Sequence, residues 1–337
     1  MPEITIEEVE GDAAQAVDLL SDSHWRDLAP LPYPPLPQPV VEIDMDEETA
    51  LLMGRFWAVK TAGELSERAL ALTEHIILHI NGAHYTVWEW RWRCVLALRG
   101  KEVGDVEESG SPPGVADTTP WPSAIGFPTA VPAPALEAER ELHAAVAAAN
   151  PKNYQLWNAR RRAAAAAGAG ALALELAFTG ACLALDAKNY HAWAHRQAVV
   201  AAAWEESVAR AELEATRQLL GEDPRNNSAW SYRMYLVRAL AADLAGVGRR
   251  AGGGGPLEGG ATLDPGSPLI AIEMDLVRNA VHAVPSSQSA WAYALGLRPL
   301  VPAGALNQGI AALARQVLGA APWSLAALRA LRRAEGP

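Results

Sequence analysis

The residues with the clearest chemical potential lie in a block that occurs twice, KNYQLW at 152–157 and KNYHAW at 188–193. In both copies a lysine precedes an asparagine, and asparagine is a strong helix N-cap. An ammonium group beside the free N–H groups and positive dipole end of a helix start suits an anion. From these residues alone Lys152 is best interpreted as a solvated turn lysine, and an anion site at this helix start is the alternative.

Other reactive groups are sparse. The eight histidines are scattered, and no His/Cys/Asp cluster has the spacing of metal ligands. The two cysteines, Cys94 and Cys182, lie far apart on apolar segments, which indicates small core side chains and no disulfide framework. We therefore expect no metal bound by this chain and a reducing, cytoplasmic setting.

Composition excludes several classes of protein. The chain has 337 residues, with 28 Lys+Arg against 39 Asp+Glu, so its formal net charge is −11. A protein that binds nucleic acid needs a basic face, which this balance argues against. No apolar run of about 18 residues predicts a membrane span, and the acidic start does not resemble a secretory signal.

A repeat positions the lysine block. Five segments align on a tryptophan, and in four of them an arginine follows three residues later, one helical turn away. The tryptophans are Trp88, Trp157, Trp193, Trp230 and Trp291, and the arginines are Arg91, Arg160, Arg196 and Arg233. Prolines and capping residues precede the tryptophan, so each unit predicts a helix, a short turn and a second, capped helix.

Stacked hairpins of this kind predict an all-α fold, an α-α superhelix (solenoid) of helical-hairpin repeats. We assign residues 46–300 to the repeats and expect exposed, disordered insertions at about 104–135 and 246–268, where Gly and Pro are dense. Residues 1–45 predict an extended, Pro-rich arm, and 301–337 a divergent helical tail. In the third unit, Leu174, Phe178, Ala181 and Leu185 share a spacing that predicts one buried face.

The ordered set of segments resembles a known family, the α subunit shared by protein farnesyltransferase and type I protein geranylgeranyltransferase. The similar segments are SHWRDLAPLP at 23–32, SERALALT at 66–73, HYTVW at 84–88, PKNYQLW at 151–157, DAKNYHAWAHRQ at 186–197 and DPRNNSAW at 223–230. The fifth repeat, around Trp291, lacks the arginine. In the second repeat Trp157 is followed by Asn-Ala-Arg-Arg, where the family usually shows two histidines before the arginines.

The resemblance implies a subunit that is active only as a heterodimer. Its β partner would hold Zn²⁺ and most of the isoprenoid site, and Mg²⁺ would accompany the diphosphate; no cofactor would be bound by this chain alone. The enzyme would transfer a farnesyl or geranylgeranyl group from the isoprenoid diphosphate to the cysteine thiol of C-terminal CaaX motifs in protein substrates.

The resemblance also assigns site residues. Lys152 would be catalytic and bind the diphosphate, with Tyr190, Lys188 and His191 beside it. Peptide-binding residues would be Gln155, Tyr85 and Tyr154. For the tyrosines the alternative is packing against the next hairpin. The tryptophan and arginine series is assigned a structural role, with the arginines pairing to carboxylates or carbonyls of neighbouring units.

Two other functions compete. A helical-repeat scaffold or adaptor without catalysis would need the tryptophans, arginines and caps, but not Lys152 and Gln155. The α subunit of Rab geranylgeranyltransferase is the other relative, although its equivalent turns do not read KNYQ and KNYH.

Overall fold

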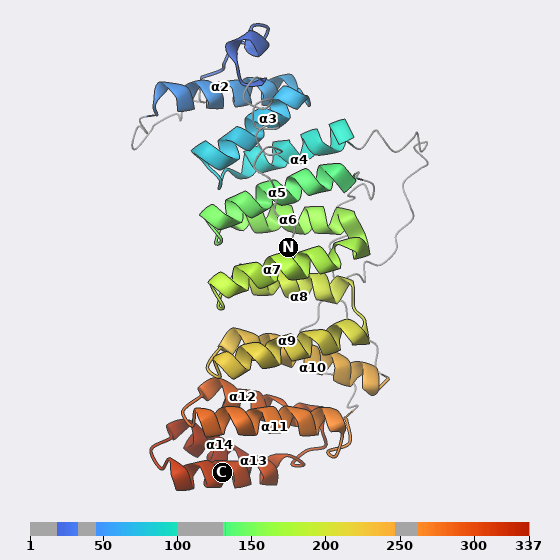
Figure 1. The fold of residues 1–337 in the computed structure, drawn as a ribbon, viewed down its shortest axis with the longest axis vertical. Helices are drawn as coiled ribbons and strands as arrows, with labels where there is room; N and C mark the ends of the chain where they lie inside the picture. The colour runs from blue at the N-terminus through green and yellow to red at the C-terminus, as the bar shows by residue number, and fades with distance from the viewer. Residues whose placement is uncertain (1–18, 33–44, 100–130, 132, 247–261, 337) are drawn as a thin grey trace, which may run out of the picture. The chain divides into compact units, whose positions relative to one another are not determined.

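A computed structural model of the chain describes residues 19–32, 45–99, 131, 133–246 and 262–336. The described chain divides into two compact units between residues 171 and 172. Within each unit successive helices pair into hairpins, and the hairpins stack side by side (Figure 1). The described residues are helices and connecting turns, which confirms the all-α fold of hairpin repeats.

The first unit contains η1 (Asp22–Trp25), α2 (Glu47–Ala62), α3 (Glu67–His75), the π-helical turn η2 (Ile76–Ile80), α4 (Tyr85–Arg99), α5 (Ala133–Ala149), α6 (Tyr154–Ala167) and η4 (Gly168–Ala171). The second contains α7 (Leu172–Leu185), α8 (Tyr190–Ala202), α9 (Glu206–Glu222), α10 (Asn227–Leu244), α11 (Pro268–Ala283), α12 (Gln288–Gly296), η5 (Arg298–Leu300), α13 (Asn307–Ala320) and α14 (Leu325–Glu335).

Each unit has two layers. First helices of the hairpins pack on first helices, as α9 does on α11, and second helices on second helices, as α8 does on α10 and α10 on α12. The predicted caps start the second helices: Asn153, Asn189, Asn226 and Ser287 each accept from backbone N–H groups of the first turn. Ser66 caps α3 in the same way. The local sequence therefore sets where each hairpin turns.

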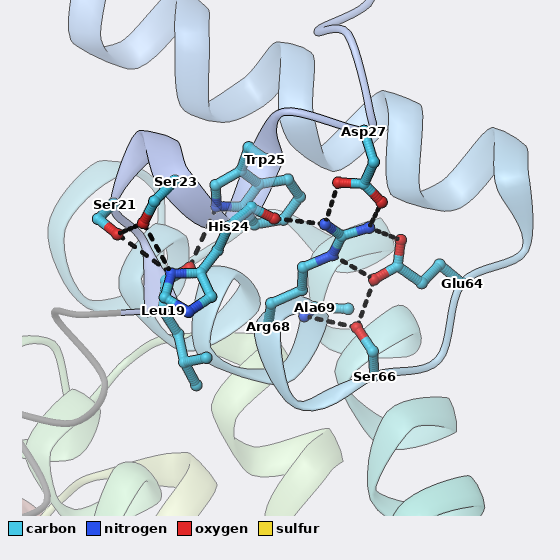
Figure 2. Close-up of polar contacts among 10 residues, drawn as sticks. All are labelled: Leu19, Ser21, Ser23, His24, Trp25, Asp27, Glu64, Ser66, Arg68 and Ala69. Atoms are coloured by element: carbon cyan, nitrogen blue, oxygen red, sulfur yellow. Dashed lines mark hydrogen bonds and ion pairs between the residues drawn. The ribbon is translucent and has the colours of Figure 1, made fainter.

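The N-terminal segment departs from the expected extended arm. Residues 22–25 form a helical turn. Trp25 is buried, and the guanidinium groups of Arg55 and Arg68 lie 5.3 and 4.9 Å from its ring centre. Figure 2 shows Arg68 between the carboxylates of Asp27 and Glu64, which raise its pKa. A short stretch ordered by charge-assisted bonds replaces the extended arm over residues 19–32; residues 33–44, which hold most of the prolines of that arm, lie outside the described residues.

Gly54 lets this segment lie against α2. The Leu31 N–H donates to the Gly54 carbonyl at 3.0 Å, and a Cβ on residue 54 would lie 2.9 Å from the Leu31 carbonyl oxygen. Gly54→Ala should therefore displace residues 30–31 and cost about 1–3 kcal/mol of stability. Amide hydrogen exchange at Leu31 measures the displacement.

Gly221→Ala is the matched control, because that glycine lies in α9 and its added Cβ would meet nothing within 4 Å. We expect it to be neutral or slightly stabilising, since alanine has the higher helix propensity. Equal exchange at Leu31 in wild type and Gly54→Ala would show that the close approach is unimportant.

The chain segments between hairpins differ from expectation at their ends. The insertion placed at 104–135 ends earlier, because α5 begins at Ala133, and the one placed at 246–268 ends earlier, because Leu263 is buried and its N–H donates to Leu300 at 2.8 Å. Residues 100–130 and 247–261 lie outside the described residues. The tail at 301–337 contains a sixth hairpin, formed by α13 and α14.

The apolar face predicted for α7 was wrong. Leu174 and Leu185 are 48% and 90% exposed, whereas the buried side carries Glu175, Thr179 and Cys182. The core here is partly polar because the repeat buries a carboxylate, as described below. In the part of the chain that the structure describes, no helix is both long and apolar enough to cross a bilayer.

Candidate functional site

The turns of the hairpins are built around the repeat tryptophan. In all five repeats the indole N–H of the tryptophan donates to the backbone carbonyl oxygen six residues earlier. The acceptors are Gly82, Pro151, Ala187, Pro224 and Pro285, at 2.8, 2.8, 3.0, 3.0 and 3.2 Å. Each indole therefore closes its own turn while its ring is buried among the helices.

The capping residue of one repeat also donates a hydrogen bond to the turn of the repeat before it. The Asn153 side-chain amide donates to Gly82 at 2.6 Å, and the Asn226 amide to Ala187 at 3.2 Å. The Ser287 hydroxyl donates to Pro224 at 2.9 Å, and that of Ser324 to Pro285 at 2.7 Å. One turn carbonyl thus binds its own tryptophan and the next cap, which fixes neighbouring turns side by side.

Buried carboxylates hold the helices together beneath the turns. Arg196 donates to both Glu212 oxygens at 2.6 and 2.7 Å, and Arg233 to both Glu273 oxygens at 2.6 and 2.8 Å. Arg91 pairs with Glu139 at 2.8 Å. In each case the arginine belongs to the hairpin that precedes the one carrying the glutamate. The predicted pairing between neighbouring repeats is therefore confirmed for these three arginines.

Glu212 and Glu273, and likewise Glu175 of α7, each lie against a side chain two residues after the tryptophan of their own repeat. Tyr232 donates to Glu212 at 2.8 Å and Tyr293 to Glu273 at 2.7 Å, and His195 lies 2.7 Å from Glu175. Burial, followed by the neighbouring carboxylate, raises the pKa of both tyrosines well above its ordinary value. Both hydroxyls therefore stay protonated and remain donors.

Sequence reasoning missed these glutamates although a signal was present. They precede the repeat tryptophan by a constant interval: 157 − 139, 193 − 175, 230 − 212 and 291 − 273 all equal 18. An acidic residue at a fixed place in an otherwise apolar helix requires a buried partner. The arginines at the third position after the tryptophan supply that partner in three of the units.

The first of the two compact units, which ends at residue 171, holds four of the expected binding residues. Lys152 and Gln155 flank the start of α6, where the Asn153 oxygen accepts from the Gln155 and Leu156 N–H groups at 2.9 and 3.2 Å. Lys152 is exposed, and its own N–H donates to Asn150 at 3.2 Å. The turn therefore presents an ammonium group and a side-chain amide within three residues at a capped helix start.

Tyr85 and Tyr154 belong to the same set. They are the first residues of α4 and α6, whose turns are linked by Asn153, and both are 71% exposed. Tyr190 is the first residue of α8 and is 73% exposed. The alternative of tyrosines packed against the next hairpin is therefore wrong, because these rings project from the turns instead.

The second compact unit, which begins at residue 172, holds Lys188, Tyr190 and His191. The Lys188 ammonium lies 3.9 Å from Asp223, and the His191 ring centre lies 5.5 Å from that of Tyr190. Lys188 and Tyr190 line a groove of about 550 Å³ between α8 and α10, which Gln197, Asn227, Ser231 and Tyr235 also line. His191 is not among its lining residues. The groove is lined by hydroxyl, amide and aromatic groups with one cation.

The described residues do not suit a resident metal. Within them no three His, Cys, Asp or Glu side chains converge as ligands. Cys94 is fully buried, and burial raises the pKa of its thiol to about 11, while Cys182 is also buried. Neither thiol is placed to act as a nucleophile or as a metal ligand.

A family model for the protein prenyltransferase alpha subunit repeat matches residues 136–166, 172–203 and 209–240. These segments span the hairpins α5–α6, α7–α8 and α9–α10 and include six of the seven expected binding residues. The remaining one, Tyr85, lies in the preceding hairpin.

Curated relatives match a similar stretch. The chain is 42% identical over 92 residues to the protein farnesyltransferase/geranylgeranyltransferase type-1 subunit alpha of Pisum sativum, over 27% of each chain. It is 39% identical over 84 residues to the Arabidopsis thaliana protein of the same name, over 25% of this chain and 26% of the relative. The chain thus matches about a quarter of the length of these relatives.

One solved structure resembles the fold over 91% of both chains, with a TM-score of 0.55 and 21% identity: Candida albicans protein geranylgeranyltransferase-I complexed with GGPP. At that identity the likeness concerns the fold alone. The repeat match rests on the sequence of the three central hairpins, and the fold likeness extends beyond them. The three central hairpins of this chain therefore match, in sequence, the protein prenyltransferase alpha subunit repeat.

Proposed function

We propose that this chain is the α subunit of a heterodimeric protein prenyltransferase of the farnesyl or type I geranylgeranyl class. Its substrates would be an isoprenoid diphosphate and a protein with a C-terminal CaaX motif. The observation that carries the proposal is the set formed by exposed Lys152 and Tyr154 and half-buried Gln155 at the capped start of α6, inside a matched repeat. A stack of hairpins does not need a lysine, a tyrosine and a glutamine at this helix start for its own packing.

In this reaction the substrate thiolate sulfur attacks C1 of the isoprenoid while the C1–O bond to diphosphate breaks. Negative charge accumulates on the departing diphosphate, and Lys152 stabilises it as a hydrogen-bond donor and cation. The free N–H groups and dipole at the start of α6 act in the same direction. Lys152 is therefore expected to bind the transition state more tightly than the bound substrates.

The neighbouring residues are proposed to bind the peptide. The Gln155 side-chain amide can donate to the peptide's terminal carboxylate without bringing a second charge into the site. Tyr85 and Tyr154 are exposed at the linked turns of α4 and α6 and offer aromatic area to the residues of the CaaX motif. On the second unit, Lys188, Tyr190 and His191 are proposed to contact the diphosphate and the isoprenoid.

Zn²⁺ and Mg²⁺ fit the reaction, but the described residues of this chain offer no site for Zn²⁺. The described part offers no set of three converging ligands, so we assign Zn²⁺ to the partner β subunit, where it would bind the substrate thiolate. Mg²⁺ would accompany the diphosphate. The chain's own share is the ammonium of Lys152 and the donors of the two turns, and the cytoplasm is the compartment we propose.

Reconstitution tests the proposal. We expect the chain alone to be inactive, and its complex with a prenyltransferase β subunit, purified at equal amounts, to prenylate a CaaX peptide. A complex that forms but transfers nothing with either isoprenoid would contradict it. Failure to bind any β subunit would favour the non-catalytic adaptor, and transfer that requires a Rab substrate with its escort protein would favour the Rab enzyme.

Gln155→Ala in the reconstituted complex should raise the KM for the peptide about five- to thirtyfold and leave kcat within about twofold, because one neutral hydrogen bond to a charged group is lost. Steady-state kinetics with varied peptide measures both constants. Gln316→Ala, in an exposed position of α13, is the control and should change neither. A fall in kcat at constant KM would contradict the assigned role.

A further inference from the structure

The last hairpin carries a charge opposite to that of the rest of the chain. Residues 307–335, which form it, contain four arginines and one acidic residue, in a chain of net charge −11. Three of these, Arg329, Arg332 and Arg333, lie on α14 and are exposed. Within the described residues no ion pair joins these three to a carboxylate, and the one acid of the helix, Glu335, pairs with Arg315.

The same face of α14 exposes large apolar side chains. Leu325, Leu328, Arg329, Arg332 and Arg333 follow the spacing of one helix face, and all are exposed. The buried alanines on the opposite face pack against α13, so the helix is held in place by its own hairpin. The arginines are therefore displayed on a fixed scaffold beside apolar groups.

Trp323 completes this surface at the turn before α14. It is 67% exposed, and Leu325 beside it is 64% exposed. Ser324 fixes the turn by donating to Pro285 at 2.7 Å and by capping α14. In the preceding hairpin the corresponding residues before and after the capping Ser287 are Ser286 and Gln288, so the large apolar side chains are particular to this turn.

We propose that this surface, defined as Trp323, Leu325, Leu328, Arg329, Arg332 and Arg333, binds an anionic phospholipid membrane peripherally. Arginines complement lipid phosphates and the negative surface potential, while exposed Trp and Leu enter the interface between headgroups and acyl chains. An acidic polypeptide would satisfy the charges, but it would not require an exposed tryptophan and exposed leucines beside them. The inference stands without the proposed function.

Vesicle co-sedimentation of the full chain tests it. We expect binding to vesicles of equimolar phosphatidylcholine and phosphatidylserine, weakening with added salt, and little binding to phosphatidylcholine alone. Neutralising the three arginines in R329Q/R332Q/R333Q should weaken binding at least about tenfold. Trp323→Ala should also weaken it while leaving the arginines in place.

The control is R210Q/R217Q/R278Q, which removes the same charge from three exposed arginines on α9 and α11 of the same unit. It should bind vesicles nearly as wild type does, and equal thermal melting of both triple variants shows that folding is intact. Equal weakening by the two triple variants would reduce the effect to net charge and overturn the proposal. Binding to polyglutamate without binding to anionic vesicles would overturn it in favour of an acidic protein partner.

Discussion

Replacing Lys152 by alanine is expected to slow prenyl transfer by the reconstituted complex about 10²- to 10³-fold, the usual effect of removing a donor that stabilises transition-state charge. Because the interaction strengthens as diphosphate departs, the loss should fall on kcat, and the affinity for the peptide should change little. Single-turnover transfer at saturating substrates, with peptide binding measured in parallel, separates the two.

Arg225 provides the matched control for this variant. It is also exposed, occupies the corresponding turn position before a capping asparagine, and lies two hairpins further along the chain. Arg225→Ala should leave kcat within about threefold of wild type, since water and salt screen the charge of a distant surface cation and it stabilises the transition state little. If Lys152→Ala and Arg225→Ala slowed transfer equally, a general electrostatic effect would explain the result, and the specific role of Lys152 would be lost.

The second large effect concerns stability. Arg233→Met should lower the free energy of unfolding by about 3–5 kcal/mol, because it leaves the fully buried Glu273 carboxylate without its cation. The same guanidinium donates to the Thr216 hydroxyl at 2.8 Å and to the Leu213 carbonyl, so three helices lose a shared contact. Urea denaturation followed by circular dichroism measures the loss.

Arg210→Met removes a guanidinium from an exposed pair with Glu206 and should cost about 0–1 kcal/mol. In the double variant R233M/E273Q the unpaired buried charge is absent, so part of the stability should return. A cost for Arg233→Met no larger than that for Arg210→Met, or no recovery in the double variant, would contradict the account of the buried pair.

The sequence was sufficient to predict where the hairpins turn, but not which side chains are buried in the interior. Asn153, Asn226 and Ser287 cap where they were expected because capping depends on a few neighbouring residues. The buried face of α7 could not be found from apolar spacing, since it contains Glu175 and Thr179 and leaves Leu185 exposed. Hydrophobic periodicity identifies faces that bury apolar groups and is misleading where a repeat buries a carboxylate.

The candidate site shows the same division. The lysine and amide beside the capped start of α6 follow from sequence, because their positions depend on one local turn. The projection of Tyr85, Tyr154 and Tyr190 did not follow, because a tyrosine next to a core tryptophan suits either packing or exposure. The groove beside Lys188 arises from the spacing of two packed helices, which is a tertiary property.

Chemical rescue tests most directly whether this chain supplies a cation to a reaction carried out mainly by its partner. The complex that contains Lys152→Ala would be assayed at constant ionic strength with increasing methylammonium or ethylammonium, and with tetramethylammonium, which cannot donate a hydrogen bond. We expect the two donors to accelerate transfer by the variant and not by wild type, and tetramethylammonium to have no effect. A variant complex that is intact, slow and insensitive to every amine, or one as fast as wild type, would contradict it.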